Sequence, residues 1–295
     1  MIISSLIFMN IFALTVSLLI VVSDRVISNY GTYKITINDD KELEAAGGQS
    51  LLRILYENKY FIPSACGGNG TCGYCKLKVT EGGGPPLLTE KLILTPQEEL
   101  MGMRMACQLK VRNDLKIEIP AEYSEIQEYI GDISFSRKVT SDIRKIRIKL
   151  NDPDKISYKP GQYIQIRIDT SGGTDFRAYS IASDPNETGE IELNVKQIPD
   201  GLGSTYIHSL KVGDTVDFLG PCGNFYLRET HRKIICVAGG VGLAPLKSIV
   251  QYWKSNNINR KIELYYGTRT IKDLYDHDYF VKLAEEYRNF TYHPA

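Results

Sequence analysis

Hydrophobic and polar residues follow different periods in successive stretches of this 295-residue chain. The first stretch, 2–22, is dominated by Ile, Leu, Val, Phe and Ala and carries no charge. Residues 33–38 (YKITIN) alternate as a strand does, whereas apolar residues in 51–60 (LLRILYENKY) share one helical face. The pattern therefore predicts mixed strands and helices behind an apolar N-terminal segment.

The apolar stretch 2–22 is long enough to span a membrane, which takes about 20 residues. A signal peptide is the alternative, but the stretch has no positively charged n-region and no A-x-A-like cleavage site before Asp24 and Arg25. We therefore predict a transmembrane helix over 2–22. Because Arg25 and Lys34 follow it, the positive-inside rule predicts a cytoplasmic location for the remainder.

The next region, up to Pro120, predicts a small sheet with short helices. The stretch KELEAAGG is a partner for the strand at 33–38, and Ser50 is a helix cap. Thr95, Pro96 and Glu98 form a capping box with proline at the first helical position, predicting a helix that ends near Met103. Further strands are predicted in CKLKVTEG, MACQLKV (105–111) and LKIEIP.

From about residue 121 the pattern changes to short strands at regular spacing, separated by Gly and Pro turns. Such spacing predicts an antiparallel barrel or sandwich. The strands are KIRIKL, PGQYIQIRI, RAYSIAS, IELNVKQI and TVDFLGP. After them, KIICVAGGVGLAPLKSIVQYW predicts an apolar strand, a Gly-rich turn and an amphipathic helix, and KIELYYGTR predicts a second strand. A strand, tight turn and helix of this kind can hold a phosphate on the helix N-terminus.

The amino-acid composition argues against some classes of function, namely nucleic-acid binding and hydrolysis. Lys+Arg and Asp+Glu both number 35, so there is no basic field for nucleic acid. The 4 histidines lie in no H-E-x-x-H or triad-like context and give no support for hydrolysis. The length accommodates two or three domains.

The most informative motif is a set of four cysteines, Cys66, Cys72, Cys75 and Cys107. Three lie in one Gly-rich loop with C-x5-C-x2-C spacing, and the fourth follows alone in MACQLKV. This is the layout of a 2Fe–2S ferredoxin site, which passes single electrons. Zinc is the main alternative, but zinc ribbons pair two close C-x2-C knuckles. Disulfides suit an oxidising compartment that nothing here indicates.

Two further cysteines, Cys222 and Cys236, lie in turn or apolar contexts. We interpret them as inert core thiols.

RAYSIAS resembles the RxYS flavin fingerprint of the ferredoxin–NADP reductase superfamily. The resemblance implies that Arg177 grips the flavin diphosphate, Tyr179 flanks the isoalloxazine, and Ser180 hydrogen-bonds near N5, where hydride arrives. Tyr179 and Ser180 are thus the residues expected at the reacting atoms. A strand with an incidental Arg and Ser is the alternative for so short a motif.

Two neighbouring motifs resemble the same superfamily. Gly203, Ser204 and Thr205 match its Gly-Ser/Thr diphosphate turn, and GPCGNF matches the stretch leading to its nucleotide domain. Gly239, Gly240, Gly242 and Pro245 match its GGxGxxP pattern, although any tight strand-to-helix turn selects glycine. Thr268 and Arg269 match Y-G-x-R, where the ribose end of a nicotinamide nucleotide is held, although Arg269 is equally compatible with an exposed loop charge.

The whole arrangement resembles the F subunits of the sodium-translocating NADH:quinone reductases. The C-x5-C gap, the leading apolar segment and RMACQLKVRNDLKIEIP carry this resemblance. It implies a multidomain α+β and α/β chain. The expected parts are a transmembrane helix (2–22), a β-grasp ferredoxin-like domain (32–120), an antiparallel β-barrel FAD domain (124–228) and a partial doubly wound, truncated NAD domain (229–295).

The implied activity is electron input to such a complex. NADH would give hydride to FAD, and the 2Fe–2S cluster would pass single electrons to membrane subunits that reduce quinone and move sodium. The implied location is the bacterial inner membrane, single-pass, with the soluble domains on the cytoplasmic side. FAD rather than FMN, and NADH rather than NADPH, follow from the family likeness alone.

Two departures keep alternatives open. The loop between the strands at PGQYIQIRI and RAYS is short, and the nucleotide region stops after βαβαβ at Ala295, without the family's C-G-P segment. The short loop leaves a related membrane-bound reductase as an alternative. The short nucleotide region indicates either a fragment of a longer chain or a defective nucleotide half, and as it stands we expect a poorly stable last domain with exposed strand edges. The rivals are the reductase component of an oxygenase and a tethered flavin and iron–sulfur carrier unable to turn over NADH.

Overall fold

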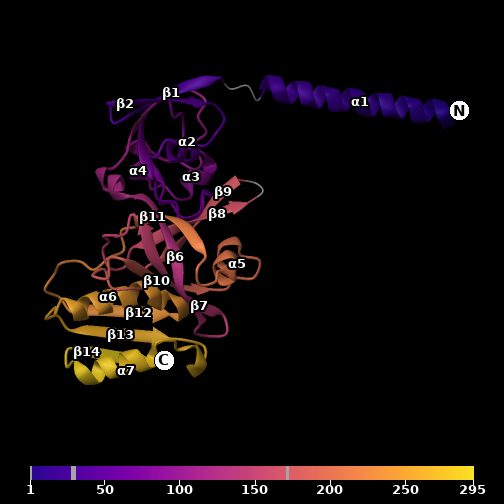
Figure 1. Cartoon of the computed structure of the whole chain (residues 1–295). Coiled ribbons are helices and arrows are strands. Elements are labelled where there is room, and N and C mark those ends of the chain that lie inside the picture. Colours follow the sequence, from indigo (N-terminus) through magenta and orange to yellow (C-terminus); the bar gives the residue numbers. More distant parts are fainter. Residues whose placement is uncertain (1, 28–30, 171–172) are drawn as a thin grey trace. The chain divides into compact units, whose positions relative to one another are not determined.

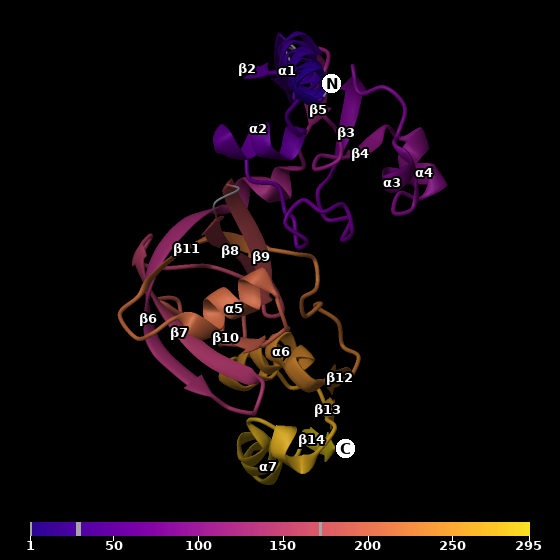
Figure 2. The same cartoon turned by 90° about the vertical axis from the view of Figure 1, so that its right-hand side faces the viewer.

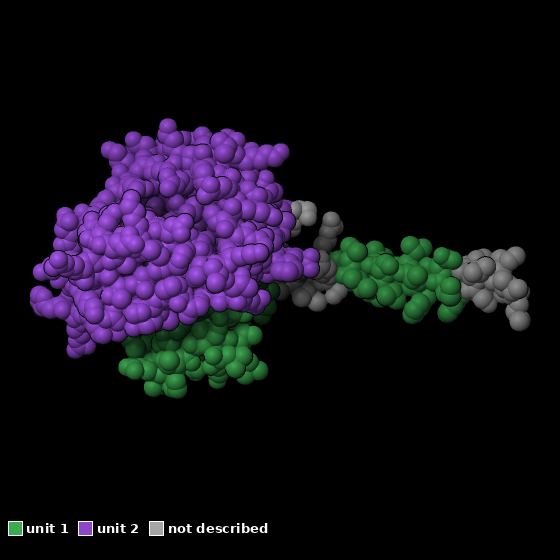
Figure 3. All heavy atoms as spheres, turned by 90° about the horizontal axis from the view of Figure 1, so that it is seen from below, with its two compact units in different colours: residues 1–60, 69–120 green, residues 61–68, 121–295 purple. Residues whose placement is uncertain are grey.

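The computed structural model describes residues 2–27, 31–170 and 173–295, and within its first helix, α1 (Ile2–Ile27), it describes side chains only for 8–21 (Figure 1). The chain divides into two compact units, coloured separately in Figure 3. The first comprises residues 1–60 and 69–120, and the second comprises 61–68 and 121–295.

The predicted transmembrane helix over 2–22 lies within α1. All side chains described in α1 are exposed. Among the described residues, no helix is both long and apolar enough to cross a membrane. The predicted span is therefore not confirmed.

The first unit contains a five-stranded sheet with strand order β2-β1-β5-β3-β4. β1 pairs antiparallel with β2 and parallel with β5, while β3 pairs antiparallel with β5 and β4. This confirms the strands predicted at 33–38 and in KELEAAGG, CKLKVTEG and LKIEIP. Ile35, Ile37 and Leu77 lie in the core. The strand bounds are β1 (Thr32–Ile37), β2 (Lys41–Ala46), β3 (Lys76–Glu81), β4 (Met103–Met105) and β5 (Leu115–Glu118).

Short helices cover this sheet. Ser50 caps α2 (Leu51–Glu57) by accepting a hydrogen bond from the Arg53 amide, as predicted, but the helix ends before residue 60 because Lys59 adopts φ +64°. α3 spans Leu88–Lys91. The predicted capping box at Thr95 begins α4 (Pro96–Leu100), which ends earlier than Met103 because Gly102 turns the chain at φ +77°.

One predicted strand of the first unit is wrong. The stretch MACQLKV (105–111) leaves the sheet after Met105, and Cys107 lies in a turn. The amides of Gln108 and Leu109 both donate to the Met105 carbonyl, at 2.9 and 3.0 Å. The Ala106 amide donates to the Cys75 carbonyl at 2.9 Å, so the turn is fixed directly against the cysteine loop.

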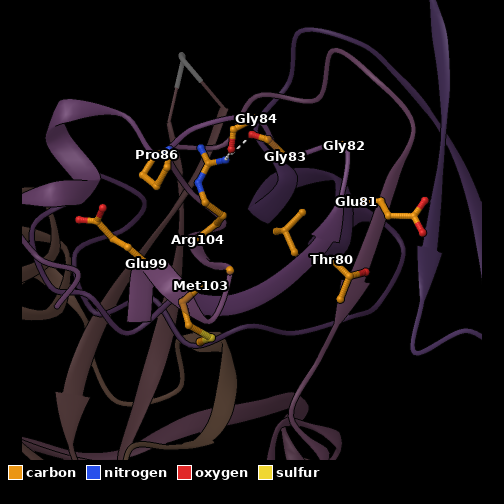
Figure 4. Close-up of a pocket in the computed structure, with 11 residues that line it drawn as sticks. Thr80, Glu81, Gly82, Gly83, Gly84, Pro86, Glu99, Met103 and Arg104 are labelled. Atoms are coloured by element: carbon orange, nitrogen blue, oxygen red, sulfur yellow. Dashed lines mark hydrogen bonds between the residues drawn. The ribbon is translucent and has the colours of Figure 1, made fainter. Parts of the chain in front are cut away.

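A buried ion pair holds the segment between β3 and α4. Arg104 on β4 binds both carboxylate oxygens of Glu90, with Nε–Oε1 at 3.0 Å and the second nitrogen at 2.7 Å from Oε2. Its remaining nitrogen donates to the carbonyls of Gly83 and Gly84 (Figure 4). Arg104 thereby lines a pocket of about 200 Å³ and holds the loop at residues 82–84 against the sheet.

Within the second unit, the part from residue 121 onward begins with η1 (Ala121–Glu125), followed by a curved antiparallel sheet with strand order β10-β7-β6-β11-β8-β9. A single bridge between Ile181 and Leu193 joins its two ends. The predicted antiparallel barrel is therefore present as a half-barrel sheet around an apolar core that includes stacked Tyr129 and Phe218. The strands are β6 (Gln127–Lys138), β7 (Ile143–Asp152), β8 (Tyr163–Thr170), β9 (Gly173–Ser180), β10 (Glu190–Lys196) and β11 (Thr215–Cys222).

The single helix of the half-barrel, α5 (Leu202–Ser209), packs against β8 and β10 among the described elements (Figure 2). Its Ile207 is fully buried in the barrel core. The start of α5 lies close to β9, where a Cβ on Gly203 would meet Arg177 and Tyr179.

The nucleotide half has three parallel strands in the order β12-β13-β14, as the βαβαβ pattern predicts. One face carries a cluster with Trp253 and side chains of both helices, while Ile235, Val237 and Tyr265 on the other face are exposed. The elements are β12 (Ile234–Gly239), η2 (Gly240–Gly242), α6 (Leu243–Ser255), β13 (Ile262–Gly267), η3 (Ile271–Asp273), α7 (His277–Glu286) and β14 (Phe290–Pro294).

Candidate functional site

Two of the four predicted cluster ligands meet inside the first unit. Cys75, immediately before β3, is fully buried, and its Sγ lies 3.3 Å from Sγ of Cys107. The hydrogen bond to Cys107, together with burial, raises the pKa of the Cys75 thiol. The loop between Cys72 and Cys75 requires glycine at Gly73, which has φ +70° and where a Cβ would lie 2.7 Å from the Ile93 side chain.

The other two predicted ligands, Cys66 and Cys72, are half-buried. Cys66 belongs to segment 61–68, which groups with the second unit, where the Ser64 amide donates to Oε1 of Gln165 at 2.5 Å. Within the described residues, no three or more His, Cys, Asp or Glu side chains gather closely enough to hold a metal ion. The structure thus brings together Cys75 and Cys107 but does not assemble the complete predicted set.

The thiols outside the predicted cluster set are deeply buried. Cys222 and Cys236 are 1 % and 2 % exposed, and burial raises the pKa of each to about 12. A thiol with so high a pKa forms little thiolate at neutral pH. The burial confirms the interpretation of both as core thiols.

The predicted flavin residues come together in the second unit. Arg177, Tyr179 and Ser180 lie at the end of β9, and Gly203 lies in the first turn of α5. A Cβ on Gly203 would meet the Tyr179 hydroxyl and lie 2.6 Å from Cγ of Arg177. Two motifs that are separate in the sequence therefore form one surface, and only glycine fits at their contact.

The groups at this surface are an arginine paired with a carboxylate and the first amides of α5. Arg177 is partly exposed, and one of its nitrogens donates to Asp175 at 2.5 Å and to the Phe176 carbonyl at 2.8 Å. Gly201 caps α5 without a side-chain hydrogen bond, so the helix begins with amide donors that no capping side chain occupies. Burial raises the pKa of Tyr179 to about 12, so its hydroxyl stays protonated.

Ser204 and Thr205 have different partners from those the motif implies. The Ser204 hydroxyl accepts from the Ile198 amide at 3.0 Å and lies near the carbonyls of Ile198 and Gly201, so it shapes its own turn. Thr205 is exposed and accepts from Gln197 at 3.3 Å.

Sequence reasoning missed Asn194, whose side chain is 5 % exposed on β10. Its Oδ1 is buried and, among the described residues, has no hydrogen-bond partner. A buried amide oxygen without a donor is costly, which fits a strand that meets a polar cofactor. In the sequence, Asn194 is one of several polar residues that alternate with apolar ones in IELNVKQI, so no local signal singled it out.

The predicted nucleotide residues lie at one edge of the parallel sheet. Gly239 is in register with Gly267, so the turn 239–242 and the pair Thr268 and Arg269 follow adjacent strand ends. A Cβ on Gly239, Gly240 or Gly242 would meet nothing within 4 Å, which shows open space beside the turn. Pro245 lies in the first turn of α6, whose N-terminus has no side-chain cap. An open turn at a helix N-terminus suits a phosphate. Arg269 is exposed.

Family models match three consecutive regions of the chain. They are a 2Fe-2S iron-sulfur cluster binding domain over residues 35–112, an oxidoreductase FAD-binding domain over 131–226 and an oxidoreductase NAD-binding domain over 236–295. These domains support a 2Fe–2S cluster, FAD and NADH as the cofactors and substrate. Together with the fold, they define the chain as an oxidoreductase that combines flavin, nicotinamide nucleotide and iron–sulfur cluster.

Comparison with whole proteins identifies the family more narrowly. The F subunit of the Na(+)-translocating NADH-quinone reductase of Klebsiella pneumoniae is 32 % identical over 335 residues, covering 100 % of this chain and 82 % of the relative. That of Marinomonas is 31 % identical over 319 residues, covering 95 % and 78 %. The chain belongs to the family of Na(+)-translocating NADH-quinone reductase F subunits.

Solved structures share the fold. A cytochrome P450 reductase of Amycolatopsis matches with a TM-score of 0.67 and 28 % identity, covering 89 % of this chain and 80 % of that one. The FAD apo form of a ferredoxin reductase in carbazole 1,9a-dioxygenase matches with a TM-score of 0.62 and 25 % identity, covering 90 % and 82 %.

Proposed function

We propose that this chain is the electron-input subunit of a membrane quinone reductase coupled to sodium transport, driven by NADH. When bound, FAD accepts hydride from NADH and the 2Fe–2S cluster carries electrons singly. The observation that carries the proposal is the contact of Gly203 with Arg177 and Tyr179, which joins two flavin motifs in one surface. The names of the relatives support the quinone and sodium parts.

The proposed roles follow the chemistry of each side chain. Arg177 and the amides at the start of α5 bind the flavin diphosphate, while Tyr179 and Ser180 orient the ring and its N5 edge. The glycine turn 239–242 and the N-terminus of α6 bind the nucleotide phosphates, and Thr268 and Arg269 bind its ribose end. No side chain is required as a general acid or base, because hydride transfer is the chemistry of the cofactors.

The four cysteines Cys66, Cys72, Cys75 and Cys107 are the proposed cluster ligands. The match of residues 35–112 to a 2Fe–2S domain supports this assignment, as does the thiol pair at 3.3 Å. The left-handed glycines of the loop allow its backbone to wrap around sulfur atoms.

The visible spectrum of the anaerobically purified protein, recorded before and after addition of NADH, tests the proposal. Flavin bands over a broad cluster absorption, both bleached by NADH, are the expected result. Bleaching by dithionite alone would show a carrier that does not use NADH. A colourless protein that binds zinc would refute the cofactor assignment.

The membrane part of the proposal needs its own test. Exposed apolar side chains over 8–21, including Phe8 and Leu14, support attachment through α1 to the membrane or its subunits. In a bacterial host, we expect the chain on the cytoplasmic side of the inner membrane, released by deletion of 2–22. Sodium-dependent quinone reduction after mixing with the membrane subunits would support the partner assignment, whereas sodium-independent reduction would contradict it.

An oxygenase reductase is the second candidate, because the P450 reductase structure covers 89 % of the chain at a TM-score of 0.67. The discriminating measurement is the electron acceptor. Rapid reduction of a P450 haem or an oxygenase ferredoxin by the NADH-reduced chain, without reduction of quinone through membrane subunits, would favour that candidate.

A further inference from the structure

Four charged side chains are buried where the half-barrel meets the nucleotide half of the second unit. Lys145 lies on β7, Glu192 on β10, Lys247 on α6, and Asp276 immediately before α7. Their side chains are 12 %, 4 %, 7 % and 16 % exposed, respectively. We call them the buried tetrad.

The tetrad alternates positive and negative charges. Nζ of Lys247 lies 2.6 Å from Glu192 and 2.7 Å from Asp276. Nζ of Lys145 lies 2.7 Å from the other oxygen of Asp276 and 3.7 Å from Glu192. Each lysine ammonium therefore lies between two carboxylates, and the four charges sum to zero. Arg147 also approaches Glu192, at 3.3 Å, from the more exposed side.

Burial alone would favour the neutral form of each group, but the partners outweigh it for two of them. Burial opposes the charge on Asp276, yet Lys247 and Lys145 hold the pKa of this carboxyl below its usual value. Burial likewise opposes the charge on Lys247, yet Glu192 and Asp276 raise its pKa. Lys247 and Asp276 are therefore charged at neutral pH.

Asp276 also has an unusual backbone. Its φ of +59° and ψ of +17° lie in the left-handed region, which is uncommon for residues other than glycine. Both carboxylate oxygens are bound by lysines that come from other elements. Strained positions persist where the surroundings fix them, and here the tetrad supplies that constraint.

The tetrad lies on elements that adjoin both proposed cofactor surfaces. Lys247 lies on the helix that follows the glycine turn, and β10 contacts η2 within that turn. Glu192 accepts a 3.5 Å hydrogen bond from Nδ2 of Asn194. Oδ1 of the same asparagine is the buried oxygen, without a partner among the described residues, that is described above. One lysine therefore connects the nucleotide helix to the strand that carries Asn194.

We propose that Lys247 is a positioning residue for hydride transfer, because it bridges Glu192 and Asp276 and so fixes the nucleotide turn relative to the flavin surface. This inference rests on the proposed function. Hydride transfer needs reacting atoms about 3–3.5 Å apart, and a displacement of about 1 Å can slow such a step roughly 100-fold. Buried ion pairs are weak stabilisers but specific in geometry, which suits a positioning role.

The main test compares two variants with the wild-type holoprotein by stopped-flow reduction of the flavin with NADH. Lys247→Met leaves an unbalanced buried carboxylate, so its fold is at risk. The double variant Lys247→Met/Glu192→Gln restores charge balance, leaving Lys145 paired with Asp276. We expect the double variant to transfer hydride about 10- to 100-fold more slowly. Flavin content and the KM for NADH should change less than about threefold, because neither proposed binding surface is altered.

Two controls separate positioning from stability. Lys247→Arg keeps a cation between both carboxylates and should recover the rate to within about threefold of wild type. Lys282→Met removes an exposed lysine on α7 and should have no effect. A double variant with a wild-type hydride-transfer rate would overturn the inference.

A second readout does not depend on turnover. Spin labels at exposed Lys211 on the half-barrel side and exposed Lys272 in the nucleotide half report the spread of distances between the two halves. We expect a broader or shifted distribution in the double variant, and an unchanged distribution would refute the positioning role. If wild-type flavin is not reduced by NADH, the proposed function fails, while the label distances still decide the role of the tetrad in alignment.

Discussion

Breaking the buried pair of Glu90 and Arg104 should loosen the first unit locally. The Glu90 side chain is 0 % exposed and that of Arg104 is 5 % exposed. The carboxylate accepts two bonds from Arg104 and one each from the amides of Leu87 and Met105, both at 2.9 Å. Arg104→Met removes the cation and leaves the carboxylate buried with only the two amides.

The magnitude follows from the burial of the pair. Removing one partner of a buried ion pair costs about 3–5 kcal/mol, because an uncompensated charge remains. Removing one partner of an exposed pair costs about 0–1 kcal/mol. Lys78→Met provides the matched control, since Lys78 and Glu118 are 42 % and 51 % exposed in a pair of similar length, 2.8 Å.

Native-state amide hydrogen exchange is the appropriate assay, because it gives an opening free energy for individual amides in the complete holoprotein. We expect the Met105 amide to lose about 3–5 kcal/mol of protection in Arg104→Met and less than about 1 kcal/mol in Lys78→Met. Glu90→Gln/Arg104→Met contains no buried charge and should recover at least half of the loss. A loss below about 1 kcal/mol in Arg104→Met would refute the reasoning.

Three further predictions concern the flavin surface, the cluster and acid stability. Gly203→Ala should weaken FAD binding about 10- to 100-fold by fluorescence titration, because overpacking costs about 1–3 kcal/mol, whereas Gly189→Ala, with only one distant contact at 3.7 Å, should bind normally. Cys75→Ser should abolish the cluster absorption while Cys236→Ser retains it, and equal iron contents in the two would contradict the ligand assignment. Burial would raise the pKa of Glu90, but Arg104 and backbone amides hold it below its usual value. The stability it contributes is therefore present above the unfolded pKa of about 4.3 and is lost as the pH falls below it, so Met105 protection should decline with acid in wild type more than in Glu90→Gln.

Much of the fold could be predicted because its signals are local. The alternation at 33–38, the Ser50 cap and the Thr95 capping box each depend on residues within a few positions of one another, and the structure confirms all three. The glycine turn before α6 is equally local. Such features need no knowledge of distant contacts.

The missed features depend on distant partners. Cys107 lies in a turn rather than a strand because the Ala106 amide binds the Cys75 carbonyl, a contact between separate segments. The tetrad joins Lys145 to Asp276 across 131 positions. In the sequence, Lys145 and Glu192 look like ordinary solvent-facing charges on alternating strands, and only the structure pairs them with Asp276 and Lys247 from distant segments.

The exposed face of the nucleotide sheet has a consequence for handling the protein in solution. Parallel sheets usually have both faces covered, but Ile235 and Val237 here are 54 % and 74 % exposed. Salts such as sulfate, which are excluded from protein surfaces, strengthen the burial of such residues. We therefore expect self-association that increases with sulfate concentration and decreases in dilute, low-salt buffer, so oligomer sizes measured during purification will depend on the solvent as much as on the chain.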